Sequence, residues 1–115
     1  MLISVLVRRL KPGKTYEDFV DAWYPDKGFG FDGRGPILAR NMEDEREIVA
    51  IGFMDLRRDE LPSTMERIAA QESVRHDRID EVIESTALRG IYEIADEFDF
   101  GTDESVARGR PARGR

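Results

Sequence analysis

The chain has 115 residues, which allow one domain and leave no room for a second hydrophobic core. Apolar residues make up 40% and charged residues 37%, the balance of a globular protein. The lack of cysteine excludes disulfides, iron–sulfur clusters and thiolate zinc sites, and no run approaches the roughly 18 apolar residues that span a bilayer. We therefore expect a cytoplasmic protein with no membrane contact.

The first element predicted is a strand over residues 2–10, an apolar and β-branched run that ends before Pro12-Gly13. Its basic residues follow the apolar stretch, the reverse of a secretory signal. A helix then begins at Thr15, with Asp18 as its capping partner, and ends before Pro25. Its apolar stripe has helical spacing and consists of Tyr16, Phe19, Val20 and Trp23.

A glycine-rich irregular segment is predicted over residues 27–35, followed by strands over residues 36–42 and 47–56 that are joined by a polar hairpin loop. A second helix opens at Pro62-Ser63, where Ser63 and Glu66 have capping-box spacing.

Residues 73–78 are polar and predict a break in that helix, after which Ile79, Val82 and Ile83 form a short amphipathic piece. A fourth strand is predicted over residues 88–95. The folded domain is predicted over residues 1–100, and residues 101–115 are predicted to be a disordered basic tail.

The element order is βαββαβ, which predicts an α+β protein of ferredoxin-like type. In that arrangement a four-stranded antiparallel sheet carries both helices on one face. The first and third strands are the most apolar, so we expect them in the middle of the sheet. The strand that opens with Pro36 is expected at an edge.

Both faces of the two central strands are apolar: Leu2, Leu6 and Leu10 alternate with Ile3, Val5 and Val7. Helices bury only one face, so the other exposes on the order of 300 Å² of flat apolar surface, near the upper limit for a monomer. The simplest partner is the same face of a second copy. The sequence therefore predicts a homodimer through the open sheet face.

The stretches VLVRRLKPGKTYEDFVDAW, REIVAIGFMDL and ALRGIYEIADEF, in this element order, resemble the dimeric α/β-barrel superfamily. Its members include stress-responsive barrel proteins and antibiotic-biosynthesis-type monooxygenases. The resemblance covers roughly residues 1–100. It implies a dimeric α/β barrel and leaves the reaction open, because members include cofactor-free oxygenases, haem-degrading enzymes and proteins without known activity.

Two candidate catalytic residues are His76 and Arg8. His76 is the only histidine, and it is interpreted either as a proton-transfer group or haem ligand, or as a solvated residue. Arg8 lies mid-strand among leucines, where its charge needs a partner; it either anchors an anionic ligand oxygen or pairs across a dimer. Haem-degrading relatives also use an asparagine in the first strand and a tryptophan late in the sheet, which this chain lacks. No cofactor is therefore expected.

Aromatic residues supply candidate binding positions for a small aromatic ligand, or else they are plain core. Trp23 and Tyr24 close the first helix, and Phe29 and Phe31 are interpreted as a lid over a pocket or a cap on the core. Edge-strand polar contacts complete the predicted substrate-binding set, which is Trp23, Tyr24, Phe29, Phe31, Asn41 and Tyr92.

Residues 28–33 match G-x-G-x-x-G, but the segment follows a helix and leads into a strand, the wrong context for a dinucleotide site. With one histidine and no cysteine, no metal site is predicted.

The net charge of −6 divides into −10 for residues 1–104 and four arginines among residues 105–115. Arg108-Gly109-Arg110-Pro111 has the form of a minor-groove hook, but the acidic body repels a phosphate backbone, so nucleic acid is not an expected partner.

Two function classes stay open. One is a small-molecule binder or cofactor-independent monooxygenase that acts on an aromatic compound. The other is a non-catalytic dimer in stress response or regulation, with a weak nucleic-acid contact by the Arg108–Pro111 stretch as a minor alternative.

Overall fold

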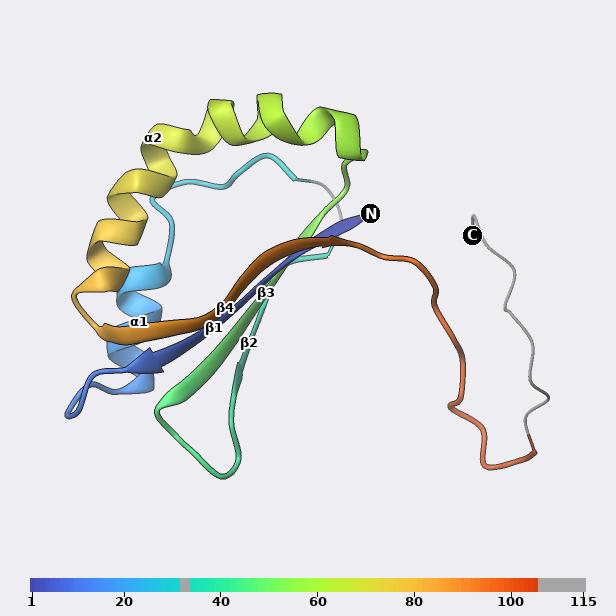
Figure 1. Ribbon diagram of the computed structural model, residues 1–115, viewed down its shortest axis with the longest axis horizontal. Coiled ribbons are helices and arrows are strands. Elements are labelled where there is room, and N and C mark those ends of the chain that lie inside the picture. The colour runs from blue at the N-terminus through green and yellow to red at the C-terminus, as the bar shows by residue number, and fades with distance from the viewer. Residues whose placement is uncertain (32–33, 106–115) are drawn as a thin grey trace.

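The computed structural model describes residues 1–31 and 34–105 (Figure 1). The order of elements is βαββαβ, as predicted. Their bounds are β1 Leu2–Leu10, α1 Tyr16–Trp23, β2 Ile37–Arg40, β3 Glu47–Met54, a short 3-10 helix η1 Arg58–Glu60, α2 Leu61–Asp80 and β4 Ile83–Glu93.

The four strands form one antiparallel sheet in the order β2-β3-β1-β4, so the two most apolar strands are central as predicted. Both helices cover the same face (Figure 1). This arrangement confirms the ferredoxin-like α+β fold.

The core lies where α1 and the last turn of α2 meet one end of the sheet. Thr15 accepts a hydrogen bond from the Asp18 backbone N–H at 3.1 Å, and the Asp18 carboxylate accepts one from the Thr15 backbone N–H at 2.9 Å, which confirms the predicted start of α1. The buried cluster consists of Leu10, Phe19, Ala22, Ile48, Ile79, Val82 and Ile83, and Tyr16 and Trp23 pack against it. Phe19 of α1 therefore belongs to the core, and the partly buried side chains of Tyr16 and Trp23 lie at its boundary.

The predicted break at residues 73–78 is wrong, because α2 is one continuous helix of 20 residues. The stretch contains neither glycine nor proline, and its polar residues have partners on the helix: buried Arg75 bonds to Glu72 one turn earlier. The predicted capping box is also wrong. The helix begins at Leu61, and the Ser63 hydroxyl donates to the Glu60 carbonyl instead.

Strand β4 begins at Ile83, five residues before its predicted start, since Val82 and Ile83 enter the core rather than a helix. Beyond β4, residues 94–105 leave the sheet on the side opposite to the helices (Figure 1). Residues 106–115, which carry the arginine tail, lie outside the described residues.

The open face of the sheet is apolar along its central strands, as predicted. Leu2, Arg8 and Leu10 are buried on the helix-covered side, so strand alternation puts Ile3, Val5 and Val7 on the other side. The register pairs Val7 with Leu88 and Ile3 with Tyr92, and these two β4 side chains are exposed. The face therefore extends apolar surface onto the edge strand.

Candidate functional site

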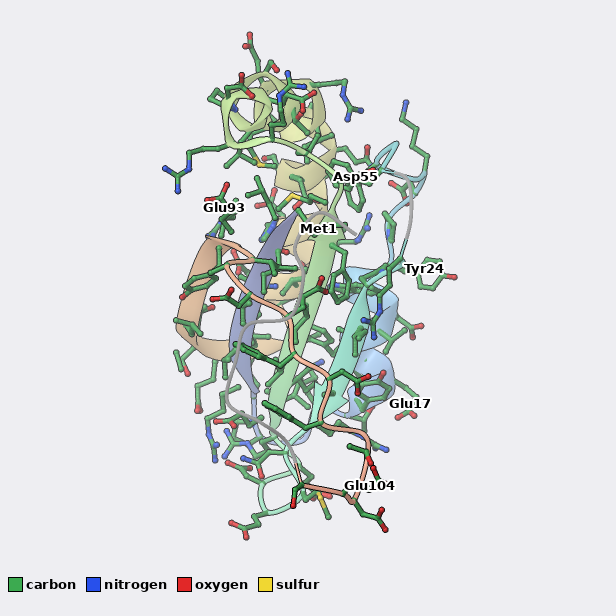
Figure 2. All side chains as sticks on the ribbon, turned by 90° about the vertical axis from the view of Figure 1, so that its right-hand side faces the viewer. Met1, Glu17, Tyr24, Asp55, Glu93 and Glu104 are labelled. Carbon is green, nitrogen blue, oxygen red and sulfur yellow. The ribbon has the colours of Figure 1, made fainter. Side chains whose placement is uncertain are left out.

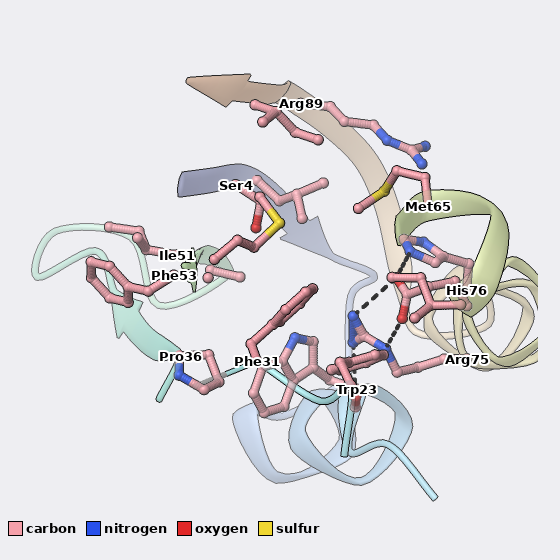
Figure 3. Close-up of a pocket in the computed structure, with 18 of the residues that line it drawn as sticks. Ser4, Trp23, Phe31, Pro36, Ile51, Phe53, Met65, Arg75, His76 and Arg89 are labelled. Atoms are coloured by element: carbon pink, nitrogen blue, oxygen red, sulfur yellow. Dashed lines mark hydrogen bonds and ion pairs between the residues drawn. The ribbon is translucent and has the colours of Figure 1, made fainter. Parts of the chain in front are cut away.

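A cavity of about 490 Å³ lies between α2, the segment over residues 25–36 and the helix-facing side of the sheet (Figure 3). This volume falls within the range of small-molecule sites. The lining residues come from every strand except β2, from both helices and from the irregular segment; the described ones are Ser4, Leu6, Trp23, Phe29, Phe31, Pro36, Ala50, Ile51, Gly52, Phe53, Met54, Met65, Ile68, Glu72, Arg75, His76, Arg89, Gly90 and Ile91.

Small side chains on the sheet make the space. Ser4 pairs with Gly52 and Leu6 pairs with Ala50 across β1 and β3. A Cβ atom at Gly52 would stand 2.7 Å from the Ser4 Oγ, so a side chain at this position would displace the Ser4 hydroxyl. Large side chains therefore fill the space between the sheet and the helices at the core end, and short side chains leave a cavity at the other end.

Aromatic rings form the wall opposite the sheet. Trp23 comes from the end of α1, and Phe29 and Phe31 come from the irregular segment, with their ring centroids 6.2 Å apart in a stacked arrangement. Arg67 of α2 holds this segment by donating to the Phe29 carbonyl at 2.9 Å. The wall is thus attached to α2 even though it has no regular secondary structure.

The polar end of the cavity is built from one face of α2. Glu72, Arg75 and His76 have i, i+3 and i+4 spacing, which places them together on a continuous helix. Arg75 Nε donates to Glu72 Oε1 at 2.9 Å, and its NH1 donates to the Trp23 carbonyl at 2.9 Å (Figure 3). Its guanidinium also lies over the Trp23 and Phe29 rings, at 5.6 and 5.4 Å from their centroids.

The Glu72 carboxylate is committed to these neighbours. Burial raises its pKa, but hydrogen bonds from His76 and Arg75 and the charge of Arg75 outweigh burial, so the pKa lies below its ordinary value. Glu72 therefore stays ionised at neutral pH and fixes both neighbouring side chains.

The contacts of His76 determine its tautomer. An arginine can only donate, so the Arg8 NH2 group, 3.3 Å from His76 Nδ1, requires that nitrogen to be the acceptor. The other nitrogen, Nε2, then carries the proton and donates to Glu72 Oε2 at 3.0 Å. Both ring nitrogens are therefore occupied, and the side chain lines the cavity.

Arg8 contacts His76 but does not line the cavity, and it is 4% exposed. Its Nε atom is buried and has no hydrogen-bond partner among the described residues. Burial lowers the pKa of this guanidinium, and the charges of Arg89 and Arg75 lower it further. Such a buried group with an incomplete set of partners costs stability, and sites that carry a function often contain one.

The structure places the predicted site residues in two groups. Trp23, Phe29, Phe31 and His76 line the cavity, and Arg8 contacts His76. His76 lies inside a helix and is half-buried, so the interpretation as a solvated residue at a helix start is wrong.

The other three predicted binding residues lie away from this cavity. Tyr24 is 66% exposed and projects outward from the body (Figure 2). Asn41 is exposed in the β2–β3 connection and bonds to Glu47, and exposed Tyr92 belongs to the open face.

Sequence reasoning missed Ser4, Glu72, Arg75 and Arg89. The signal for Glu72 and Arg75 was their helical spacing to His76, which the predicted helix break concealed. Arg89 lies among exposed residues on an edge strand, so residue type does not mark it. Its side chain is on the cavity side because the register of β4 pairs Arg89 with Leu6.

The glycine-rich motif is followed by β2 and not by a helix, and a dinucleotide site requires a helix at that point. The last two residues of the motif, 32 and 33, lie outside the described part of the chain. Within the described ranges, no group of three or more histidine and acidic side chains is arranged to hold a metal ion. No helix in those ranges is long and apolar enough to span a bilayer.

No family model matches the chain, and no curated protein matches it. Among the solved structures that share its fold are the following two. A putative antibiotic biosynthesis monooxygenase from Chloroflexus aurantiacus aligns with a TM-score of 0.57 at 10% identity, over 87% of this chain and 98% of that one. An uncharacterized NIPSNAP domain protein from Burkholderia xenovorans aligns with a TM-score of 0.57 at 22% identity, over 83% and 95%. At these identities the likeness establishes the ferredoxin-like α+β fold and no activity.

Proposed function

We propose that this protein binds a small, largely apolar molecule, with an aromatic ring system as the best fit, in the cavity between the sheet and α2. The observation that carries the proposal is a hollow of about 490 Å³ with one aromatic wall and one polar end. Apolar walls with a few convergent polar groups are the general character of ligand sites. The proposal also accounts for Ser4, Ala50 and Gly52, short residues where a closed core would have large ones.

Whether the ligand also reacts is a finer question, raised by the likeness to a putative monooxygenase. Cofactor-independent oxygenation needs a base that takes a proton from the substrate. His76 is the chemically suited group, but both its nitrogens are already bonded. This contact pattern favours binding without turnover, the role of a non-catalytic regulatory or stress-response protein. Oxygen uptake with 1-naphthol, measured with and without the protein, separates the two roles.

The proposed binding is tested with N-phenyl-1-naphthylamine, an uncharged aromatic dye. Trp23 is the only tryptophan and lines the cavity, so energy transfer from tryptophan to the dye reports binding to the protein, and a variant with a blocked cavity assigns the site. We expect saturable transfer with one dye per chain.

A blocked variant provides the control. Ser4→Phe puts a ring into the cavity and should abolish the transfer, whereas Ser73→Phe, on the exposed side of α2, should leave it unchanged. Equal dye binding by the parent and both folded variants would refute binding in the cavity.

We also propose a homodimer through the open sheet face. Support comes from the apolar alternation of β1 and β3 and from exposed Leu88 and Tyr92 beside them, 41% and 45% exposed. Soluble monomers seldom leave such a continuous apolar face in water.

A further inference from the structure

We infer that the ligand of the cavity is an organic anion, an apolar body that carries one negatively charged head group of carboxylate or sulfonate type. The head lies at the end formed by α2 and β4, and the body lies against the aromatic wall. This inference rests on the proposed function, because it names the class of ligand for the same cavity.

Three arginines converge on this end of a protein that is otherwise acidic. Arg75 and Arg89 line the cavity, and Arg8 stands behind His76. They come from α2, β4 and β1, so the fold and not a local run of sequence gathers them. The chain as a whole carries a net charge of −6, so a positive cluster of this kind runs against its average composition.

The acids in reach do not neutralise the cluster. Among the described residues, Glu72 is the one carboxylate that lines the cavity, and it is bonded to Arg75 and His76. Asp80 acts on Arg8 only through its charge, and the repulsion from Arg89 and Arg75 exceeds the attraction from Asp80 and Glu72. The site therefore keeps an excess of positive charge, which an anion in the cavity would balance.

Arg89 is the arginine that is available to a ligand. It lines the cavity, is exposed, and makes no hydrogen bond or ion pair with the described residues. Figure 3 shows its side chain reaching from β4 toward the end of the cavity that contains His76 and Arg75. A guanidinium offers a planar pair of donors that match a carboxylate. Arg8 does not itself line the cavity, but it contacts His76 and adds its positive charge to this end.

The remaining walls limit the rest of the ligand. Away from the arginines the described part of the lining is apolar, with Phe31, Pro36 and Met54 among its members, and that part contains no second set of charged groups. A sugar or a polyphosphate would leave its polar groups without partners there, which is costly. A ligand with one charged head group on an apolar or aromatic body would match both the arginine end and the apolar walls of the cavity.

The test compares two dyes that share one skeleton. 8-Anilino-1-naphthalenesulfonate carries an anionic group, and N-phenyl-1-naphthylamine lacks it; each is titrated by energy transfer from Trp23. Arg89→Gln should weaken sulfonate binding about five- to tenfold, the effect of a partly exposed charge-assisted contact, and leave binding of the neutral dye within about twofold. Arg89→Lys, which keeps the charge, should retain most of the affinity.

Arg57→Gln is the matched control. It removes the same charge from an exposed arginine outside the cavity and should change neither affinity. Added salt should weaken binding of the sulfonate alone.

The outcomes separate the two proposals. If the neutral dye binds and Arg89→Gln changes both dyes equally or neither, the anion inference is overturned while binding in the cavity stands. If neither dye shows transfer from Trp23 in the parent protein, both fall. Circular dichroism establishes that each variant is folded before it is titrated.

Discussion

Glu72 is the residue on which the polar end depends, because it accepts from Arg75 and from His76 and keeps both in place. Its pKa lies below the ordinary value of 4.5, so the native state binds fewer protons than the unfolded chain in the acid range. The resulting stabilisation is fully present above the unfolded pKa and is lost as the pH falls through the lower folded pKa.

Glu72→Gln should therefore lower the free energy of unfolding by about 1–2 kcal/mol at pH 7, as expected when hydrogen bonds to a charged group are lost. The difference from the parent should shrink as the pH falls from about 5 toward 3, since the parent then loses the same charge. Urea unfolding at several pH values measures this. A difference that stays constant down to pH 3 would show that the charge of Glu72 does not contribute.

Individual site residues were predictable from the sequence only where residue type sufficed. Trp23, Phe29, Phe31 and His76 stood out as aromatic or unique, and the cavity contains them. Tyr24 was chosen by the same reasoning, yet it follows the last residue of α1 and points into solvent. Residue type does not give the direction of a side chain at the end of a helix.

At the scale of elements, α2 determines whether the site exists. A continuous helix puts Glu72, Arg75 and His76 on one face, and a helix broken at residues 73–78 would separate them. Polar composition suggested the break, but polar residues interrupt a helix only when they bond to the backbone in other ways, and here they bond to each other and to α1.

Ser73→Pro tests that continuity. Within a helix a proline removes one hydrogen bond and clashes with the preceding turn, so we expect a loss of about 3 kcal/mol in the free energy of unfolding. Ser73→Ala at the same exposed position should be neutral or slightly stabilising. A cost below about 1 kcal/mol for the proline variant in chemical denaturation would indicate the broken helix instead.

The strands and the element order were predictable because their signals are local and strong. The alternation of β1 and β3, and the proline before β2, fix which strands are central. The start of β4 was not predictable, because Val82 and Ile83 suit a helix or a strand equally and tertiary packing decides between them. The missed position of Arg89 follows directly from that register.

For the whole molecule, the uncovered sheet face is the main feature that one chain leaves unexplained. A homodimer predicts a mass of about 26 kDa in light scattering at micromolar concentration, twice the 13.2 kDa of the chain. Val5→Lys puts a charge in the middle of the face and should give a folded monomer. Ser73→Lys, on the helical side, should leave the dimer intact. A parent protein of 13 kDa under these conditions would contradict the dimer.

We propose separate roles for the two surfaces of the sheet: the open face would meet a second copy, and the covered face closes at one end over a core and at the other over the cavity.

The most direct test is a crystal structure of the protein with 8-anilino-1-naphthalenesulfonate bound. We predict that the naphthalene ring lies between the sheet and the rings of Trp23 and Phe31, with the sulfonate within hydrogen-bond distance of Arg89. A dye bound elsewhere, with the cavity empty or filled by protein side chains, would contradict the proposal that this cavity is the functional site.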